Sequence, residues 1–598
     1  MKNLFFLKML FLVSFYSFSQ GVGIGTTTPD FSAILDITAT NKGLLIPRMD
    51  IPSINAITNP ARGLLVYDSV GNRLMVNIGT ALTPNWQPVA GNGAGGWNLD
   101  GNIGINPSNQ FIGTTDNQPL RFRVNNIQAG ELHPETGNIF WGLRAGEANI
   151  SGFSNIAIGT EALKFDKEGI NIVAIGDSAL FNNGKNNPVP GVFGINNTEI
   201  GSKSLFSNTI GSDNTATGFK SLFSNIDGFD NSAYGVGSLG SNTAGGSNTA
   251  IGVSALFANT TGNDNTATGW RSLNANTTGV FNSGFGALSL NANTTGDNNT
   301  GIGFAALISN TTGENNTATG IRSLFSNITG NRNTAVGNSS LFFNTIGNEN
   351  TGVGHNALHF NTSGVNNTAI GGQSLFNNSI GLNNTANGFQ SLFANTTGIN
   401  NTAAGAGSLP ANTTGFQNTA VGVFSSFTNI TGSSITTIGF GADVSAGNLI
   451  NATAIGEGAI VNSSNKVRLG NSAVTIIEGQ VPFTTPSDGR FKYKVKEDVK
   501  GLDFIMQLRP VTYQFDVKRF DAQQKNTVDN KSNPDLGNIM QASYDEAAAI
   551  RRTGFIAQEV EKAAIVSGYD FSGIITPKNE QDHYSLSYES FVVPLVKA

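Results

Sequence analysis

Ser487 and Lys492 are a serine and a lysine close enough along the chain to support nucleophilic chemistry. A serine hydroxyl becomes a nucleophile when a neighbouring base removes its proton, and a partly desolvated lysine can hold a neutral amine near pH 7. Ser487 followed by Asp488 is also typical of an ordinary turn. In addition, Lys492, Lys494 and Lys496 alternate as solvated strand residues do. From spacing alone, the turn is favoured over a reactive serine and lysine pair.

Metal, phosphate and glycosidase sites have little support in the sequence. The chain has no cysteine, and its four histidines are not clustered as metal ligands are: His133, His355, His359 and His583. His355 and His359 share one repeat but have no acidic partner at ligand spacing. The glycine-rich segment 21–25 lacks the strand-to-helix context of a phosphate loop, and 350–434 contains no Asp or Glu for a carboxylate pair. We therefore expect no metal and no cofactor.

A strict repeat of 17 residues occupies the middle of the chain. Glycine holds the fifth place of each unit from Gly201 to Gly439, and leucine holds the ninth from Leu205 to Leu409. The first place is asparagine: Asn197, Asn214, Asn231, Asn248, Asn265, Asn282, Asn299, Asn316, Asn333, Asn350, Asn367, Asn384, Asn401 and Asn418. A period this short is typical of a solenoid of short strands, not of helical pairs.

The repeat therefore predicts a mainly β fold, an elongated parallel β-roll or solenoid with one unit per coil. Each unit is expected to contain two short extended pieces joined by two turns, with the asparagines stacked as an amide ladder. At about 4.8 Å per coil, the regular units would extend over roughly 70 Å.

The apolar core of each unit is thin, and this suggests how many chains assemble. Phenylalanine follows the leucine column in several units and would form an exposed stripe on a single chain: Phe206, Phe223, Phe257, Phe325, Phe342, Phe376 and Phe393. Because such stripes are normally covered by a partner, we expect burial against sister chains in a homotrimer. The array resembles the heads of trimeric autotransporter adhesins, through Asn-Thr-Ala-Ile-Gly at 248–252 and 367–371.

Composition limits the other partners. The 598 residues carry 12% charged residues and a formal net charge of -6. No stripe of Lys and Arg is present to release counterions from a phosphate backbone, so we expect no nucleic-acid partner. The absence of cysteine rules out a disulfide framework. Stability then has to come from stacking of the repeats and from oligomerisation.

The first 19 residues have the pattern of a secretory signal peptide. Lys2 and Lys8 accompany the apolar run 4–18, and 17–19 reads Ser-Phe-Ser, a small-x-small cleavage site. A membrane anchor is the alternative, but Lys8 interrupts the run and the run is short for spanning. We expect an exported protein, extracellular or at the cell surface, with no membrane span after signal removal. The expected organisation is 1–19 signal peptide, 20–96 N-terminal β module, 97–150 small β module, 151–460 repeat array, 461–486 connector and 487–598 C-terminal domain.

Secondary structure can also be predicted for the two ends of the chain, on either side of the repeat array. In the N-terminal modules, alternating or apolar runs bounded by turn residues predict strands at 33–37, 43–47, 63–67, 74–77 and 120–124. Charged residues become frequent after 487, which is typical of a conventional α+β domain. There we expect helices near 498–508 and 557–564, strands at 511–517 and 584–588, a final helical segment from 589 and a polar loop or insertion at 520–549.

Three blocks of the C-terminal domain resemble the peptidase S74 family, the intramolecular chaperones of phage tail spikes and endosialidases. The blocks are Ser-Asp-Gly-Arg-Phe-Lys at 487–492, Gly-Phe-Ile-Ala-Gln-Glu-Val-Glu at 554–561 and Tyr-Ser-Leu-Ser-Tyr at 584–588. The resemblance implies a domain that drives trimer assembly and then cuts the chain at or beside Ser487. It also implies that Ser487 is the nucleophile and Lys492 its base, which reverses the preference for a plain turn.

The N-terminal part resembles surface fibre proteins of Bacteroidetes-type bacteria, through Val-Gly-Ile-Gly-Thr at 22–26 and Ala-Ile-Leu-Asp-Ile at 33–37. Together these features indicate an exported, trimeric, fibre-like or adhesin-like rod with a self-releasing assembly domain. Its ligand class would be a surface glycan or a protein. Two alternatives remain, a phage-derived fibre with a glycan-cleaving or glycan-binding head, and a purely structural fibre whose last domain never cuts.

Overall fold

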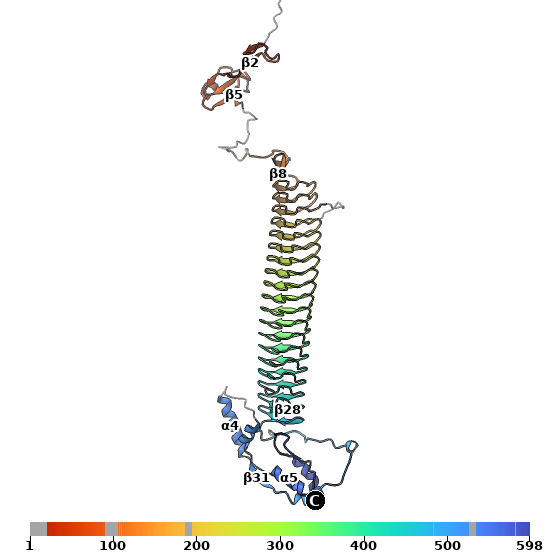
Figure 1. The fold of residues 1–598 in the computed structure, drawn as a ribbon. Helices are drawn as coiled ribbons and strands as arrows, with labels where there is room; N and C mark the ends of the chain where they lie inside the picture. Colours follow the sequence, from red (N-terminus) through yellow and green to blue (C-terminus); the bar gives the residue numbers. More distant parts are fainter. Residues whose placement is uncertain are drawn as a thin grey trace, which may run out of the picture. The chain divides into compact units, whose positions relative to one another are not determined.

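The computed structural model describes residues 21–89, 106, 108, 111–185, 194–481, 483–524, 534–579 and 582–598. The expected signal peptide at 1–19 lies outside the described residues. The chain divides into two units, 1–113 and 114–598, and each unit has its own internal packing (Figure 1).

The first unit contains two small sheets and a short helix. Ile54 of the helix packs in one cluster with Val66 and Met75 of the larger sheet. The elements are β1 (Val22–Ile24) parallel to β2 (Leu35–Ile37), the four-stranded sheet β3 (Arg48–Met49), β4 (Leu65–Asp68), β5 (Arg73–Asn77) and β6 (Trp86–Pro88), and α1 (Ile51–Asn55). Three of the expected strands are confirmed. The run at 43–47 is not a strand, and its end at Pro47 lacks the N–H that a ladder requires.

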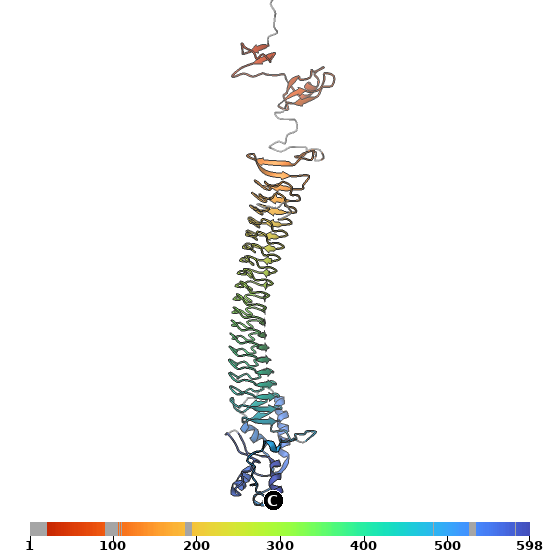
Figure 2. The same ribbon diagram turned by 90° about the vertical axis from the view of Figure 1, so that its right-hand side faces the viewer.

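The second unit is built around one long parallel sheet that receives one strand from each coil (Figures 1 and 2). The solenoid of 17-residue repeats is therefore confirmed. Its strands are β10 (Ile156–Ile158), β11 (Val173–Ile175), β12 (Thr198–Ile200), β13 (Thr215–Thr217), β14 (Ser232–Tyr234), β15 (Thr249–Ile251), β16 (Thr266–Thr268), β17 (Ser283–Phe285), β18 (Thr300–Ile302), β19 (Thr317–Thr319), β20 (Thr334–Val336), β21 (Thr351–Val353), β22 (Thr368–Ile370), β23 (Thr385–Asn387), β24 (Thr402–Ala404), β25 (Thr419–Val421), β26 (Thr436–Ile438), β28 (Ala452–Ile455) and β30 (Lys466–Leu469).

Each regular coil holds one three-residue strand, and turns close the remainder of the coil. The expectation of two extended pieces per unit was therefore wrong. The middle residue of the strand faces inward, as Ala250 and Ala267 do in register, while its two neighbours face outward. The buried leucines adopt left-handed backbone angles, for example φ 47° at Leu324, which bends the chain sharply where a second strand would otherwise run.

Two buried asparagine columns satisfy the backbone of the turns. At the first column, Asn316 Nδ2 donates to Asn299 Oδ1 at 3.1 Å and to the Gly330 carbonyl at 2.8 Å. The second column was not anticipated: Asn327 Nδ2 donates to Asn310 Oδ1 at 2.8 Å and to the same Gly330 carbonyl at 3.0 Å. These bonds replace the water that buried turn groups would otherwise need, so the amide ladder is double.

The phenylalanines beside the leucine column lie mostly half-buried and stack on one another from coil to coil. Ring centroids are 5.4 Å apart for Phe206 and Phe223 and 5.2 Å apart for Phe376 and Phe393. These rings therefore cover each other in part within a single chain. A second apolar column lies exposed at the outer face of the sheet, and it includes Ile200, Tyr234, Ile251, Phe285, Ile302, Val336, Ile370, Val421 and Ile438. Sequence reasoning placed the uncovered stripe on the phenylalanines and missed this second column.

Both ends of the sheet differ from the regular coils. At the start, β7 (Leu120–Val124) and β8 (Ile127–Leu132) form an antiparallel hairpin, and β8 pairs antiparallel with β9 (Ile139–Trp141), which then pairs in parallel with β10. The expected strand at 120–124 is confirmed. At the other end, the short strands β27 (Asp443–Val444) and β29 (Ile460–Val461) pair beside the main sheet, and β30 pairs with β28.

The C-terminal domain is a small α+β fold with its own core, as expected. Phe504, Val560, Phe571 and Phe591 are buried together. Its elements are η1 (Gly489–Phe491), α2 (Leu502–Ile505), β31 (Val511–Gln514), α3 (Val517–Gln524), α4 (Pro534–Ala549), β32 (Arg551–Gly554), α5 (Ala557–Val566), β33 (Ile574–Ile575), β34 (Ser585–Leu586), η2 (Tyr588–Phe591) and α6 (Val592–Lys597).

The interpretation of 520–549 as a loop was wrong in large part, because α3 and α4 occupy most of it. Proline at the first position of α4 is compatible with a helix start, since its missing N–H would be unpaired there anyway. Among the described residues, none of the helices has the length and apolar character needed to cross a bilayer.

Candidate functional site

Ser487 and Lys492 are brought together by a single turn. Lys492 Nζ donates a hydrogen bond to Ser487 Oγ at 2.7 Å. The turn is η1, and Asp488 caps its start by accepting from the Arg490 N–H at 2.9 Å. The Arg490 side chain also pairs with Asp488 and, through this hydrogen bond, lowers the pKa of the Asp488 carboxyl. Segment 487–492 therefore contains both the turn and the serine–lysine pair, although sequence reasoning treated them as alternatives.

The serine–lysine pair lies in water in the single chain. Ser487 and Lys492 are both exposed, and the residues from 483 to 498 are exposed throughout. Three apolar side chains of the same segment are also uncovered: Phe491, Tyr493 and Val495 are 80%, 83% and 79% exposed. The hydrogen bonds and ion pairs described for 487–492 remain within that segment. Any surface that covers this segment would therefore have to be formed by residues outside it.

The other two sequence blocks pack against each other. The Phe555 N–H donates to the Tyr588 hydroxyl at 3.0 Å, and a Cβ on Gly554 would lie 2.2 Å from that hydroxyl oxygen. Tyr584 donates to Glu561 Oε2 at 3.0 Å, a hydrogen bond that raises the pKa of Tyr584. Glycine at 554 therefore lets the Tyr588 hydroxyl approach the backbone closely, and a side chain there would push the tyrosine away.

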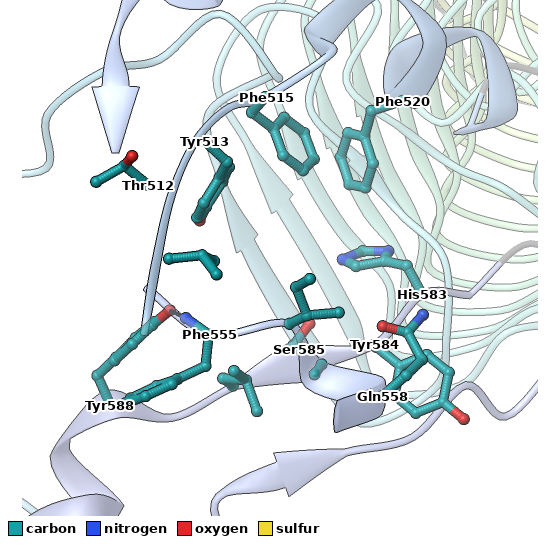
Figure 3. Close-up of a pocket in the computed structure, with 14 residues that line it drawn as sticks. Thr512, Tyr513, Phe515, Phe520, Phe555, Gln558, His583, Tyr584, Ser585 and Tyr588 are labelled. Atoms are coloured by element: carbon teal, nitrogen blue, oxygen red, sulfur yellow. Dashed lines mark hydrogen bonds between the residues drawn. The ribbon is translucent and has the colours of Figure 1, made fainter. Parts of the chain in front are cut away.

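These two blocks line a pocket of about 740 Å³ in the C-terminal domain (Figure 3). Its wall is mainly aromatic and aliphatic, with Phe520 and Tyr588 among the lining residues, and its polar groups include Gln558 and His583. His583 meets Phe520 edge to face with 4.8 Å between ring centroids, and burial, followed by the charge of Lys466, lowers the pKa of His583. Sequence reasoning missed this pocket, and neither Ser487 nor Lys492 lines it.

One histidine of the array, His359, lies in the aromatic stack. His359 replaces a phenylalanine between Phe342 and Phe376, with ring centroids 5.3 and 5.2 Å away, and its Nδ1 lies 3.1 Å from the Ser339 carbonyl oxygen. Burial lowers the pKa of His359. Within the described part of the chain, no group of three or more His, Cys, Asp or Glu residues is placed to hold a metal ion. The expectation of no metal and no cofactor stays a prediction.

Residues 487–569 match the Peptidase_S74 family model, described as the chaperone of endosialidase. Residues 23–101 match a second family model, described as the phage tail like trimerisation region. A search of the curated proteins finds no match. The first match begins at Ser487 and includes Lys492 and the block 554–561, whereas the block 584–588 lies beyond it.

The two matches and the solenoid between them fit a phage-tail-like fibre protein with a C-terminal chaperone region. They support the expected resemblance to the S74 family and the expected self-association as a homotrimer. The trimerisation region at 23–101 was not anticipated from the sequence, where trimer contacts were expected along the array and the assembly role was assigned to the C-terminal domain.

Proposed function

We propose that this protein is a trimeric fibre whose C-terminal domain assists assembly and then cuts the chain once, at or beside Ser487. The observation that carries the proposal is the 2.7 Å hydrogen bond between Lys492 Nζ and Ser487 Oγ, at the first residue of the region matching the endosialidase chaperone. The two groups are already at the distance that proton transfer between nucleophile and base requires.

The chemistry follows from these two side chains. Ser487 Oγ attacks the carbonyl carbon of the adjoining peptide bond, and Lys492 takes the hydroxyl proton and delivers it to the departing amide nitrogen. Water then hydrolyses the resulting ester, which restores the hydroxyl and leaves one new carboxylate and one new amine. The reaction consumes a bond of its own chain, so each molecule turns over once.

Assembly would control this reaction through burial. A lysine can act as a base only while its amine is neutral, and desolvation favours the neutral form. In the single chain Lys492 is exposed, as are Phe491, Tyr493 and Val495. We propose that sister chains of the trimer cover this segment, which buries the apolar side chains and removes water from Lys492 in one step. Cleavage would then follow correct assembly.

Denaturing gels and intact masses test the proposal directly. Wild type should give two fragments that meet at or beside Ser487, whereas Ser487→Ala should stay full length. Lys492→Met should slow cleavage by about 10²–10⁴-fold, the usual contribution of a general base. Lys494→Met is the matched control and should cleave as wild type does. Identical full-length bands for wild type and Ser487→Ala would contradict self-cleavage and would support a purely structural fibre.

Export and ligand binding belong to the same proposal. Lys2, Lys8 and the apolar run 4–18 support a signal peptide, and a fibre of this kind would present its side to a surface glycan or a protein. Fractionation of the producing cells tests export: the mature protein should be found outside the cytoplasm and should begin near residue 20. A cytoplasmic protein that retains Met1 would contradict it.

A further inference from the structure

The last coils of the array and the C-terminal domain meet along a charged surface, here called the seam. On the array side it is formed by 462–472, and on the domain side by Asp521, Asn579 and Asp582. The seam therefore joins residues that precede Ser487 with residues that follow it. A cut at Ser487 would break the connecting chain but none of these contacts.

An ion pair between a partly exposed lysine and a buried carboxylate is the centre of the seam. Lys466 Nζ lies 3.1 Å from Asp582 Oδ1 and donates to Asn462 Oδ1 at 2.8 Å. The Asp582 side chain is only 2% exposed. Although its burial acts in the opposite direction, hydrogen bonds from the backbone N–H groups of His583 and Lys578 and from Lys466 lower the pKa of Asp582. The carboxylate is therefore held ionised, and separating the two surfaces would remove Lys466 from it.

Two hydrogen bonds and a cation–π contact extend the seam on both sides of the ion pair. Ser472 Oγ donates to Asp521 Oδ1 at 3.0 Å, and Asn579 Nδ2 donates to the Asn462 carbonyl at 3.2 Å. The Arg468 guanidinium lies 6.0 Å from the centre of the Phe520 ring, within reach of a cation–π contact. The domain thus contacts the final strand and both flanks of it.

The last strand of the array has an edge that a retained domain could protect. β30 is the last strand of the long sheet, and in the described part of the chain it pairs only with β28. An open strand edge is a template for pairing with another chain, and terminal repeats of solenoids need a cap that keeps them soluble. The side chains of Lys466 and Arg468 on this strand are the ones that the domain covers.

We propose that the C-terminal domain stays bound to the last coil through the seam after the chain is cut, and serves there as a noncovalent end cap. The inference rests on the proposed self-cleavage for the origin of the cut. The partner that binds the 462–472 surface is therefore the cleaved C-terminal domain of the same protein.

The experiment makes the cut independently of Ser487. The full-length Ser487→Ala protein carries a site for a sequence-specific protease in the exposed connector, after 478. After complete digestion, size-exclusion chromatography in low-salt buffer reports whether the C-terminal fragment travels with the array. Dilution of a labelled fragment then gives its dissociation rate. If self-cleavage does not occur in the wild type, this measurement is unaffected, so the two proposals fail separately.

The expected result is co-elution, with dissociation about 30-fold faster or more in Lys466→Met, because the buried Asp582 carboxylate loses its cation across the seam. Asp582→Asn should also release the fragment faster. This second variant keeps the test valid if Lys466→Met does not fold. Arg332→Met, which breaks the exposed ion pair with Glu349 in the array, is the matched control and should dissociate as the parent does. Immediate separation of the parent fragments, or release from Lys466→Met no faster than from Arg332→Met, would overturn the proposal.

Discussion

Glu199 occupies a strand position where the neighbouring coils have alanine. It pairs in register with Ala174 and Ala216, it is fully buried, and neither carboxylate oxygen has a hydrogen-bond partner among the described residues. Burial raises the pKa of Glu199 well above its usual range. The carboxyl is therefore accommodated best when protonated, and its cost to the fold grows as the pH rises from the ordinary pKa of a glutamate towards the raised pKa in the folded chain.

Replacing this carboxyl should stabilise the array in a pH-dependent way. Glu199→Ala restores the alanine column, and we expect a gain of about 1–3 kcal/mol at about pH 8, with a smaller gain at about pH 5, where the buried acid is protonated. Thermal unfolding of variant and wild type at both pH values measures this. Glu314→Ala, at an exposed position, should show no such pH-dependent gain. An equal effect of Glu199→Ala at both pH values would contradict the assignment.

At the scale of the element, the coil depends on glycine at its fifth place. Gly320 has φ +133°, and a Cβ there would lie 2.5 Å from the Gly337 carbonyl oxygen of the next coil. Gly320→Ala should therefore destabilise the array by about 3 kcal/mol or more, because both the backbone angle and the close approach exclude a side chain. Denaturant unfolding followed by circular dichroism measures the loss.

Gly372 provides the matched control within the same array. A Cβ there would meet its nearest atom, on the Phe389 ring, at 3.5 Å, which is an ordinary contact. Gly372→Ala should therefore unfold close to wild type. Equal destabilisation by the two substitutions would show that the close approach between coils does not set the requirement for glycine.

The elements also show what the sequence could and could not predict. Columns at a spacing of 17 predicted the parallel solenoid, because identical coils can bury their apolar residues only by stacking. The second asparagine column, with Asn310 and Asn327 as members, was visible at the same spacing and was overlooked. The left-handed leucines were not predictable, because leucine disfavours that angle and only closure of the coil imposes it.

For the candidate site, the resemblance of three blocks predicted the contact between Ser487 and Lys492, although spacing alone favoured a turn. The pocket and the seam could not be predicted from the sequence, because both bring together residues far apart in the chain, as Lys466 and Asp582 are. The exposed setting of the serine–lysine pair was also not foreseen. It depends on which surfaces a single chain leaves uncovered.

For the whole molecule, assembly into a trimer is the claim on which the account depends. Regions matching a trimerisation region and an assembly chaperone lie at 23–101 and 487–569. Between them, the outer face of the sheet carries a column of exposed apolar side chains that includes Ile251 and Ile370, and the segment after Ser487 exposes Phe491 and Tyr493. Exposed apolar surface on this scale normally marks an interface.

The most direct test of this claim is the mass of the full-length Ser487→Ala protein in solution, measured by multi-angle light scattering. That substitution prevents the proposed cut, so every particle should contain uncut chains, each of 62.5 kDa before removal of the signal peptide. The account predicts the mass of three chains at all concentrations where the array is folded. A folded protein with the mass of one chain would contradict it, and with it the proposed burial of Lys492 by sister chains.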